Sequence, residues 1–369
     1  MCFDCYIRSL KIATILGARP QFIKASMVSN ELAHHGNIKE IIIHTGQHFD
    51  DNMSKIFFND MGIPQPEYEL KIHSLSHGAM TGRMMEGIET ILIEERPDWV
   101  LVYGDTNSTL AGSLTGAKLN IPVAHVEAGL RSFNMEMPEE INRILSDRVS
   151  TLLFCPTDNS IQNLKDEGFT MGSDRIIRCG DIMFDAAQYF VGIAKTTSTI
   201  LNDYDITDKE YVLCSIHRPE NVDDPNRLAS IMKAFNEINS ETQIILPLHP
   251  RTIKSLKEYG IESTFNYLEP VSYFDILVLL NNCQLVITDS GGLQKEAFFF
   301  KKHCVTLRNE TEWVELVDNG YSSLAGANRN TILTCFKEMM QRSSDFEVPL
   351  YGNGEARKQI VNTLLSYPI

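Results

Sequence analysis

This sequence of 369 residues has few basic residues relative to acidic ones. It contains 33 Lys and Arg against 48 Asp and Glu, which gives a formal net charge of -15 at pH 7. Nucleic acid and anionic membrane surfaces repel an acidic protein, so this balance argues against both as general partners. A phosphate-bearing ligand would need local cations on such a chain.

Long apolar runs are missing as well. No uninterrupted apolar stretch approaches the roughly 20 residues that span a bilayer. Residues 1–10 include Asp4 and lack the apolar core of a secretory signal peptide. We therefore expect a cytoplasmic protein that does not enter a membrane.

Cysteine clusters are a third absence. The eight cysteines are scattered, and several, such as Cys155 and Cys214, fall inside apolar runs, which is typical of reduced thiols in a core. Cys2 and Cys5 have CxxC spacing, but no second pair accompanies them. We interpret this stretch as an N-terminal extension rather than a metal or redox site.

What the chain does contain is a regular alternation of strands and helices. Strands are predicted at 11–17, 38–45, 99–103, 121–126, 152–155 and 176–179, and again at 211–216, 243–248, 285–288 and 304–307. Apolar residues recur at helical spacing in the segments between the strands, including 53–61 and 80–94. Residues 196–208 are interpreted as a linker. This alternation predicts parallel, doubly wound α/β sheets, whose ligands bind beyond the carboxyl ends of the strands.

The stretch Thr288-Asp-Ser-Gly-Gly-Leu-Gln-Lys-Glu296 is the most informative strand end. It forms a turn from a strand into a helix, where free N–H groups and the helix dipole favour an anion and glycines allow close approach. For such a motif alone, an ordinary Ser N-cap with turn glycines is the better explanation. Other polar strand ends shift the balance toward phosphate binding.

Those other strand ends carry residues suited to acid–base chemistry and anion binding. They are Gly17, Gly46, Asp105, Glu127, His217, Arg218, His249 and Arg251, with Arg19 and Lys24 close behind the first of them. A single histidine in such a place is more often structural than catalytic. Glu139 and Glu140 stand in the first turn of a predicted helix, where Glu is a routine dipole partner. Two His-Arg pairs beside a phosphate-type turn nevertheless support an anion site.

Seven motifs, in order, resemble the non-hydrolysing UDP-N-acetylglucosamine 2-epimerase family. They are Gly17-Ala-Arg-Pro-Gln21, Thr45-Gly-Gln-His48, Gly104-Asp-Thr106, His125-Val-Glu-Ala-Gly-Leu-Arg131, Pro138-Glu-Glu-Ile-Asn-Arg143, His217-Arg218 and Thr288-Asp-Ser-Gly-Gly-Leu-Gln294. The resemblance extends from residue 11 to about residue 357. It implies two Rossmann-like domains facing a central cleft, as in glycosyltransferase-B folds. We expect residues 1–178 plus 355–369 to carry the catalytic carboxylates and 179–354 to bind UDP.

Departures from the common family pattern point to one branch. Many members have Thr and Glu where this chain has Ala18 and Gln21, and Thr-Glu-Arg-Pro-Glu where it has Thr311-Glu-Trp-Val-Glu315. These variants resemble the branch acting on UDP-2,3-diacetamido-2,3-dideoxy-glucuronate, which supplies a manno-configured sugar for surface polysaccharide such as lipopolysaccharide. UDP-N-acetylglucosamine as substrate, a hydrolysing epimerase, a UDP-sugar glycosyltransferase and a non-catalytic sugar-nucleotide sensor remain alternatives.

The resemblance also implies roles for individual residues. UDP would leave C1 as the C2 proton is removed, and the candidate acid–base residues are Asp105, Glu127, Glu139 and His217. The candidates for binding UDP are Arg19, Lys24, His249, Arg251, Ser290, Gly291, Gly292 and Glu296. For His249 a structural role is about equally well supported. The family implies no metal, no other cofactor, and commonly a homodimer.

Overall fold

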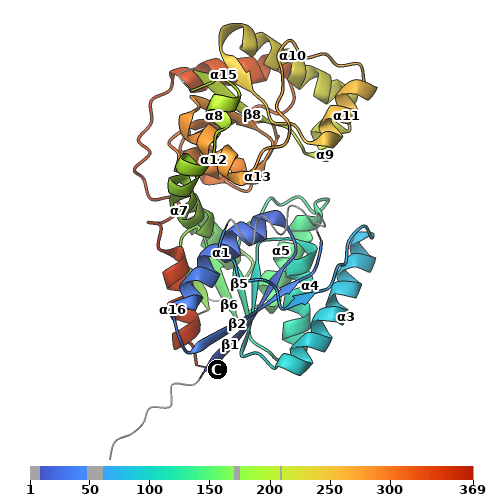
Figure 1. Cartoon of the computed structure of the whole chain (residues 1–369), viewed down its shortest axis with the longest axis vertical. Helices are drawn as coiled ribbons and strands as arrows, with labels where there is room; N and C mark the ends of the chain where they lie inside the picture. The colour runs from blue at the N-terminus through green and yellow to red at the C-terminus, as the bar shows by residue number, and fades with distance from the viewer. Residues whose placement is uncertain (1–8, 48–60, 170–174, 208–209, 369) are drawn as a thin grey trace, which may run out of the picture. The chain divides into compact units, whose positions relative to one another are not determined.

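The computed structural model describes residues 9–47, 61–169, 175–207 and 210–368 (Figure 1). The chain folds into two compact units. The N-terminal unit comprises the chain up to Ala186 together with the segment from Pro349, and the C-terminal unit comprises Ala187–Val348. Cys2, Cys5 and residues 53–60 of one predicted helix lie outside the described residues.

The N-terminal unit contains a sheet with the strand order β3-β2-β1-β4-β5-β6-β7, in which every neighbouring pair is parallel. The strands are β1 (Leu10–Leu16), β2 (Ile38–His44), β3 (Tyr68–Glu69), β4 (Trp99–Tyr103), β5 (Val123–Val126), β6 (Leu152–Cys155) and β7 (Ile176–Arg178). The central strands are almost wholly buried, as expected for a parallel sheet covered on both faces. The order reverses between β1 and β4, which makes their carboxyl ends the switch point where such folds bind ligands.

Helices cover both faces of this sheet. They are α1 (Arg19–Ala33), α3 (His77–Glu95), α4 (Asn107–Lys118), α5 (Pro138–Val149), α6 (Asp158–Asp166), the first part of α7 (Ile182–Thr197) and α16 (Ala356–Ser366). In Figure 1, α16 lies beside α1 on one side of the sheet, and α3 lies on the other. The Asp185 carboxylate accepts from the backbone N–H groups of Ala356 and Arg357, at 3.2 and 3.0 Å. The end of the chain is therefore anchored in the N-terminal unit.

The C-terminal unit contains a second parallel sheet, with the strand order β12-β11-β10-β8-β9. Its strands are β8 (Tyr211–Ser215), β9 (Gln243–Ile245), β10 (Leu285–Thr288), β11 (His303–Thr306) and β12 (Ser322–Leu324). Its helices are α8 (Ile200–Asp203), α9 (Pro219–Val222), α10 (Pro225–Glu241), α11 (Pro250–Glu258), α12 (Tyr273–Asn282), α13 (Gly291–Phe299), α14 (Val314–Asp318) and α15 (Arg329–Gln341), besides the rest of α7. Here the order reverses between β8 and β10. The doubly wound architecture is thus confirmed in both units.

Several predicted segments differ from the structure. The linker expected at 196–208 is wrong in part, because α7 continues to Thr197 and α8 follows, with Ile200 and Ile206 both buried. The strands predicted at 121–126 and 243–248 are shorter than expected. Pro122 has no N–H to donate to a neighbouring strand. Beyond Ile245 the chain forms an isolated parallel bridge between Pro247 and Leu268.

Candidate functional site

Gly17 closes β1 at the switch point of the N-terminal unit. A Cβ atom at this position would lie 2.0 Å from Ser108 Oγ and 2.2 Å from Thr45 Oγ1. Only glycine therefore lets the end of β1 come so close to Thr45, after β2, and to Ser108, in the first turn of α4. The backbone at Gly17 is thus closely approached by protein side chains.

Gln21 ties the loop after β1 to the end of β4. Its Oε1 accepts from the N–H groups of Gly17 and Ala18, at 2.8 and 3.0 Å. Its Nε2 donates to the Tyr103 carbonyl at 2.9 Å and to Thr109 Oγ1 at 3.0 Å. Gln21 is buried, and all four of these bonds use the amide as both acceptor and donor.

Lys24 and Glu127 form a buried ion pair over Gly104. Lys24 comes from α1, and its Nζ contacts Oε2 of Glu127, which directly follows β5. Gly104 has a φ of 64°, and a Cβ there would lie 3.1 Å from the Glu127 carboxylate and 3.2 Å from Lys24 Nζ. Glu127 itself has a φ of 71°, an uncommon value for a residue with a side chain. The structure thus brings together two residues to which the sequence assigned different roles.

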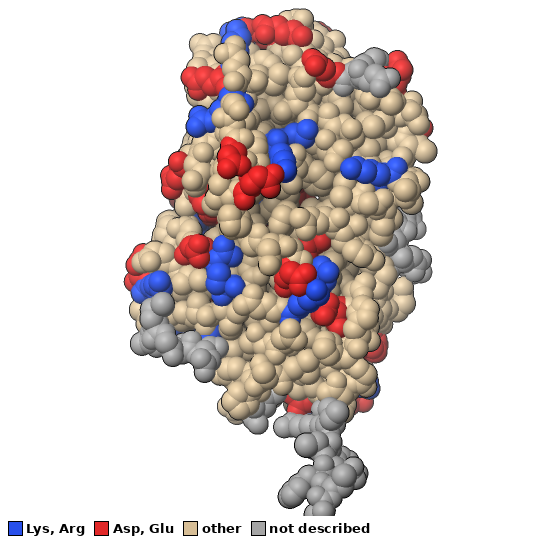
Figure 2. Space-filling model, turned by 90° about the vertical axis from the view of Figure 1, so that its left-hand side faces the viewer, with Lys and Arg blue, Asp and Glu red and all other residues tan. Residues whose placement is uncertain are grey.

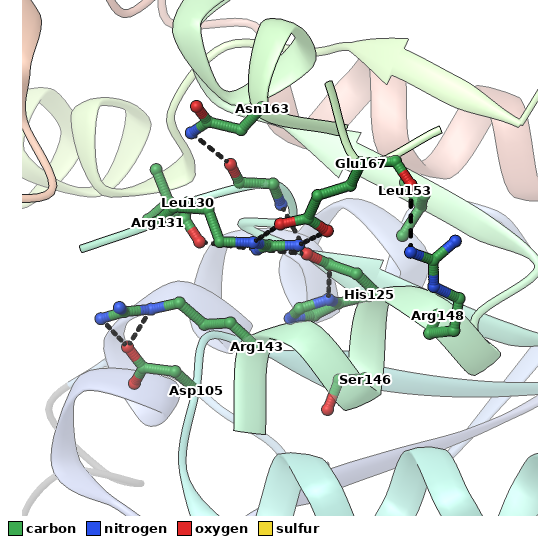
Figure 3. A network of polar contacts seen from close by, with 12 residues as sticks. Asp105, His125, Leu130, Arg131, Arg143, Ser146, Arg148, Leu153, Asn163 and Glu167 are labelled. Atoms are coloured by element: carbon green, nitrogen blue, oxygen red, sulfur yellow. Dashed lines mark hydrogen bonds and ion pairs between the residues drawn. The ribbon is translucent and has the colours of Figure 1, made fainter. Parts of the chain in front are cut away.

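Asp105 is held by an arginine of α5 (Figure 3). Arg143 donates to Asp105 Oδ2 from Nε at 3.0 Å and from Nη2 at 2.8 Å, and its Nη1 donates to Glu140 at 2.7 Å. Burial would raise the pKa of Glu140, but hydrogen bonds from Ser132 and the charge of Arg143 leave that pKa below its usual value. Asp105 keeps a partly exposed side chain. Its carboxylate is therefore both oriented and accessible.

Glu139 and Arg19 complete the N-terminal set of predicted residues. Glu139 is exposed in the first turn of α5, and Arg19 is half-buried at the first position of α1. The contacts in this unit join Lys24 to Glu127, and Arg143 to Asp105 and Glu140.

The Asp289 carboxylate organises the switch point of the C-terminal unit. It is fully buried and accepts from the N–H groups of His217 and Arg218, at 3.1 and 3.0 Å, and from Asn221 Nδ2 at 3.1 Å. His217 Nδ1 lies 3.3 Å from Asp289 Oδ1, while half of the His217 side chain is exposed. Because Nδ1 faces the carboxylate, Nε2 is the nitrogen left for a ligand.

The phosphate-type turn begins α13. Ser290 caps this helix by accepting from Leu293 N–H at 3.4 Å. A Cβ at Gly291 would lie 2.4 Å from Glu312 Oε1, so a neighbouring carboxylate already requires glycine there. At Gly292 a Cβ would meet only Ser290 Oγ at 3.9 Å. The open side of the turn is therefore at Gly292, where a ligand can approach the backbone.

The other predicted UDP-binding residues have protein partners. Glu296 is buried, and Tyr273 donates its hydroxyl to Glu296 Oε1 at 3.2 Å. His249 caps α11 by accepting from Arg251 N–H at 3.2 Å. Arg251 pairs with Asp223 at 2.5 Å, with both side chains about half exposed. The helix cap made by His249 fits the structural role that was kept as its alternative.

Charged side chains of both signs occur together on the surface. On the face shown in Figure 2, Lys and Arg side chains lie interspersed with Asp and Glu. Among the described residues, no group of three or more His, Cys, Asp or Glu is arranged to hold a metal ion. Within the same residues, no helix is both long and apolar enough to cross a bilayer.

Sequence reasoning missed several residues that shape these sites. Arg143 and Asp289 lie inside motifs that we had singled out, yet neither was a candidate, and Gln21 was noted only as a departure from the family. A charged or amide side chain at a position with apolar neighbours is the available signal, because such groups are buried only with partners. Their partners, however, come from distant segments.

The fold and the two strand-end sites define a class. Two parallel doubly wound units in one chain, each with polar residues gathered at its switch point, make this a two-domain protein with a glycosyltransferase-B-like fold.

Comparisons with known proteins identify the family within that class. Residues 30–365 match the model of the UDP-N-acetylglucosamine 2-epimerase family, to which this chain belongs. The chain is 51% identical over 357 residues to UDP-2,3-diacetamido-2,3-dideoxy-D-glucuronate 2-epimerase of Pseudomonas aeruginosa, covering 96% of this chain and 99% of that one. It is also 49% identical over 362 residues to a UDP-N-acetylglucosamine 2-epimerase homolog of Methanococcus maripaludis, with the same coverage.

Solved structures agree. The chain is similar to the UDP-GlcNAc 2-epimerase of Methanocaldococcus jannaschii in complex with UDP-GlcNAc and UDP, with a TM-score of 0.89 and 40% identity over 96% of this chain and 99% of that one. The Neisseria meningitidis enzyme bound to UDP-GlcNAc gives a TM-score of 0.86 at 30% identity, covering 97% of this chain and all of the other. The chain is therefore an isomerase, a UDP-sugar 2-epimerase.

Proposed function

We propose that this enzyme inverts C2 of UDP-2,3-diacetamido-2,3-dideoxy-D-glucuronate, giving the manno-configured UDP-sugar for surface polysaccharide. The observation that supports this substrate is the 51% identity, over nearly the whole of both chains, to the Pseudomonas aeruginosa enzyme of that name. UDP-N-acetylglucosamine is the second candidate, since relatives at 41 and 42% identity carry that name.

The chemistry follows from the position of the reacting hydrogen. No carbonyl is adjacent to C2 in the sugar ring, so a carbanion left by simple deprotonation would be unstabilised. In the proposed reaction a carboxylate takes the C2 proton, the C–H electron pair forms a C1=C2 double bond, and the C1–O bond breaks with its pair on UDP. A proton then returns to the other face of C2, and UDP adds back to C1.

Two strand ends and the start of α5 in the N-terminal unit supply the acid–base groups for this reaction. Asp105, Glu127 and Glu139 are the candidates, and we assign no single base among them. The ion pair of Glu127 with Lys24 and the clamp of Arg143 on Asp105 support a set of oriented carboxylates beside cations.

The C-terminal unit supplies the anion site. The backbone at Gly292, the start of α13 and Arg218 beside Asp289 support a cradle for the diphosphate. A negative charge develops on UDP as it leaves C1, so donors held in place before the reaction lower the barrier. We assign His217 to the sugar end of this cradle and Glu296 to the ribose.

Proton NMR in deuterated water tests the function directly. The purified protein would be incubated with UDP-2,3-diacetamido-2,3-dideoxy-D-glucuronate and, separately, with UDP-N-acetylglucosamine. We expect deuterium at C2 together with a manno-configured UDP-sugar from the first compound. Exchange with UDP-N-acetylglucosamine alone would show that this compound, and not UDP-2,3-diacetamido-2,3-dideoxy-D-glucuronate, is the substrate. Exchange with neither compound, while UDP still binds, would favour a transferase or a sensor.

The proposal also covers the oligomeric state of the enzyme and its cellular compartment. We propose a cytoplasmic homodimer, because the substrate is a nucleotide sugar and the family commonly forms dimers. Sedimentation at micromolar concentration would test the dimer, and a monomeric species with full activity would contradict it.

A further inference from the structure

His125 is a fully buried histidine whose two ring nitrogens both face hydrogen-bond acceptors (Figure 3). Nδ1 lies 2.7 Å from Asp147 Oδ1, and Nε2 lies 2.7 Å from the carbonyl oxygen of Gly104. A carbonyl oxygen has no proton to donate, so Nε2 must carry one. An ionised carboxylate has none either, so Nδ1 must carry one as well when Asp147 is charged.

Three donors hold Asp147 in its ionised form. They are His125 Nδ1, Arg131 Nη1 at 2.7 Å from Oδ2, and Gly129 N–H at 3.1 Å from Oδ2. Burial alone would raise the pKa of Asp147, but the hydrogen bonds and charges of His125 and Arg131 outweigh it and leave that pKa below its usual value. The acceptor that faces the ring is therefore a carboxylate.

Arg131 is shared between two carboxylates beside the ring. Arg131 pairs with Asp147 and also with Glu167, to which it donates from Nε at 2.5 Å and from Nη2 at 2.8 Å. Two carboxylates thus face a single guanidinium, as Figure 3 shows for Arg131 and Glu167. Glu167 is 26% exposed, whereas Asp147 is fully buried and takes donors from both Arg131 and His125 Nδ1.

Gly104 is the residue through which this ring reaches the candidate site. Its N–H donates to the Val126 carbonyl at 2.9 Å and its carbonyl accepts from His125, so adjacent residues of β5 hold both of its polar groups. Asp105 follows Gly104 directly in the chain. Lys24 and Glu127 lie over Gly104, at the distances given above.

We propose that His125 is kept doubly protonated in the folded enzyme and acts as a positioning residue, which places Asp105 and Glu127 through its charged hydrogen bond to Gly104. A hydrogen bond from a cation is about twice as strong as one between neutral groups. This inference rests on the proposed function, in which those carboxylates act at C2.

The protonation state can be measured without any substrate. Wild-type protein labelled with 15N in its ten histidine rings would be studied at pH 8, above the usual histidine pKa of about 6.5. We expect one ring with protons on both nitrogens, and that signal should be missing from His125→Gln. A His125 ring with a single N–H at pH 8 would overturn the proposal.

Two variants separate positioning from general folding. His125→Gln keeps a neutral donor within reach of the Gly104 carbonyl, and His125→Leu has none. We expect kcat for C2 exchange to fall roughly 100-fold in His125→Leu and less than about 10-fold in His125→Gln, with UDP affinity unchanged, because small misplacements of reacting groups have effects of this size. The exposed His34→Gln is the control for the substitution itself.

The outcomes are distinct. Equal kcat in His125→Leu and wild type would refute positioning, and so would a parallel loss of kcat and UDP affinity in both variants. If His125→Leu does not fold, the ring measurement on wild type and the kcat of His125→Gln still decide. A wild-type protein with no exchange would remove the proposed function and the positioning role together, whereas the doubly protonated ring would stand.

Discussion

The side-chain amide of Gln21 donates a hydrogen bond to the carbonyl oxygen of Tyr103, at 2.9 Å. Since Gln21 lies on α1 and Tyr103 ends β4, this bond crosses the switch point of the N-terminal sheet. The same amide accepts two N–H bonds from the loop after β1. One neutral side chain thus joins the two loops between which such sheets bind ligands.

Gln21→Glu tests that arrangement. A carboxylate keeps the two acceptor bonds but sets an oxygen against the Tyr103 carbonyl, so the buried Glu should be favoured in its protonated form. Its pKa would then be higher in the folded than in the unfolded protein, and stability should fall as pH rises above about 4.3. We expect a loss of roughly 1 to 3 kcal/mol at pH 8 and a smaller loss at pH 5, measured by urea unfolding.

The matched control is Gln359→Glu on the exposed face of α16. It should leave the unfolding midpoint within experimental error at both pH values. Equal stability of Gln21→Glu and wild type at pH 8 would show that the loops do not depend on the amide.

Gly104→Ala should disturb the ion pair above it. The new methyl group would lie 3.1 Å from Glu127 Oε2 and 3.2 Å from Lys24 Nζ, at a φ of 64°. We expect about 1 to 2 kcal/mol of lost stability from the left-handed backbone, and at least a tenfold loss of C2 exchange from the displaced pair. Gly62→Ala is the control, because Gly62 has the same φ of 64° with nothing within 4 Å of its Cβ position. If both variants keep full exchange, the crowding at Gly104 has no role in activity.

Asp105→Asn and Glu127→Gln should separate chemistry from binding. Each keeps the size of the side chain and removes its ability to take a proton, so C2 exchange should fall roughly 100-fold or more. UDP affinity, measured by calorimetry, should change little because the proposed diphosphate site lies in the other unit. Asp158→Asn, whose side chain is 91% exposed on α6, is the control. Wild-type exchange in either of the first two variants would exclude that carboxylate from the reaction.

Glu40→Gln should remove a pH-dependent loss of stability. Burial raises the pKa of Glu40 from 4.5 to about 7, against hydrogen bonds from Thr14 and Ser29 that lower it. Between these values the folded protein binds more protons than the unfolded chain, so the wild type loses stability as pH rises from about 4.5 to about 7. The variant keeps an oxygen that accepts from Thr14 and Ser29 and cannot ionise.

The free energy of unfolding of Glu40→Gln, relative to that of the wild type, should be roughly 1 to 2 kcal/mol higher at pH 8 than at pH 5. This figure allows for the partial exposure of Glu40. Thermal or urea unfolding at the two pH values would measure it. Glu89→Gln on the exposed face of α3 is the control. An identical pH dependence for Glu40→Gln and wild type would show that Glu40 does not titrate in this range.

The sequence alone predicted most of the strands and where polar residues follow them. Trp99–Tyr103 and Leu285–Thr288 have the predicted bounds, and Asp105 and Glu127 stand at strand ends as expected. Burial imposes a periodicity on each strand and helix, and Gly and Pro mark the turns between them, so these features can be recognised within a window of about ten to twenty residues.

The tertiary structure decided which side chains meet. Lys24, expected to contact phosphate, pairs with Glu127, 103 residues away along the chain. Arg143 reaches Asp105, and His125 reaches the carbonyl of Gly104, only because α5 and β5 lie beside the end of β4. Strand order and register determine these side-chain contacts, and the periodicity of a single segment does not predict them.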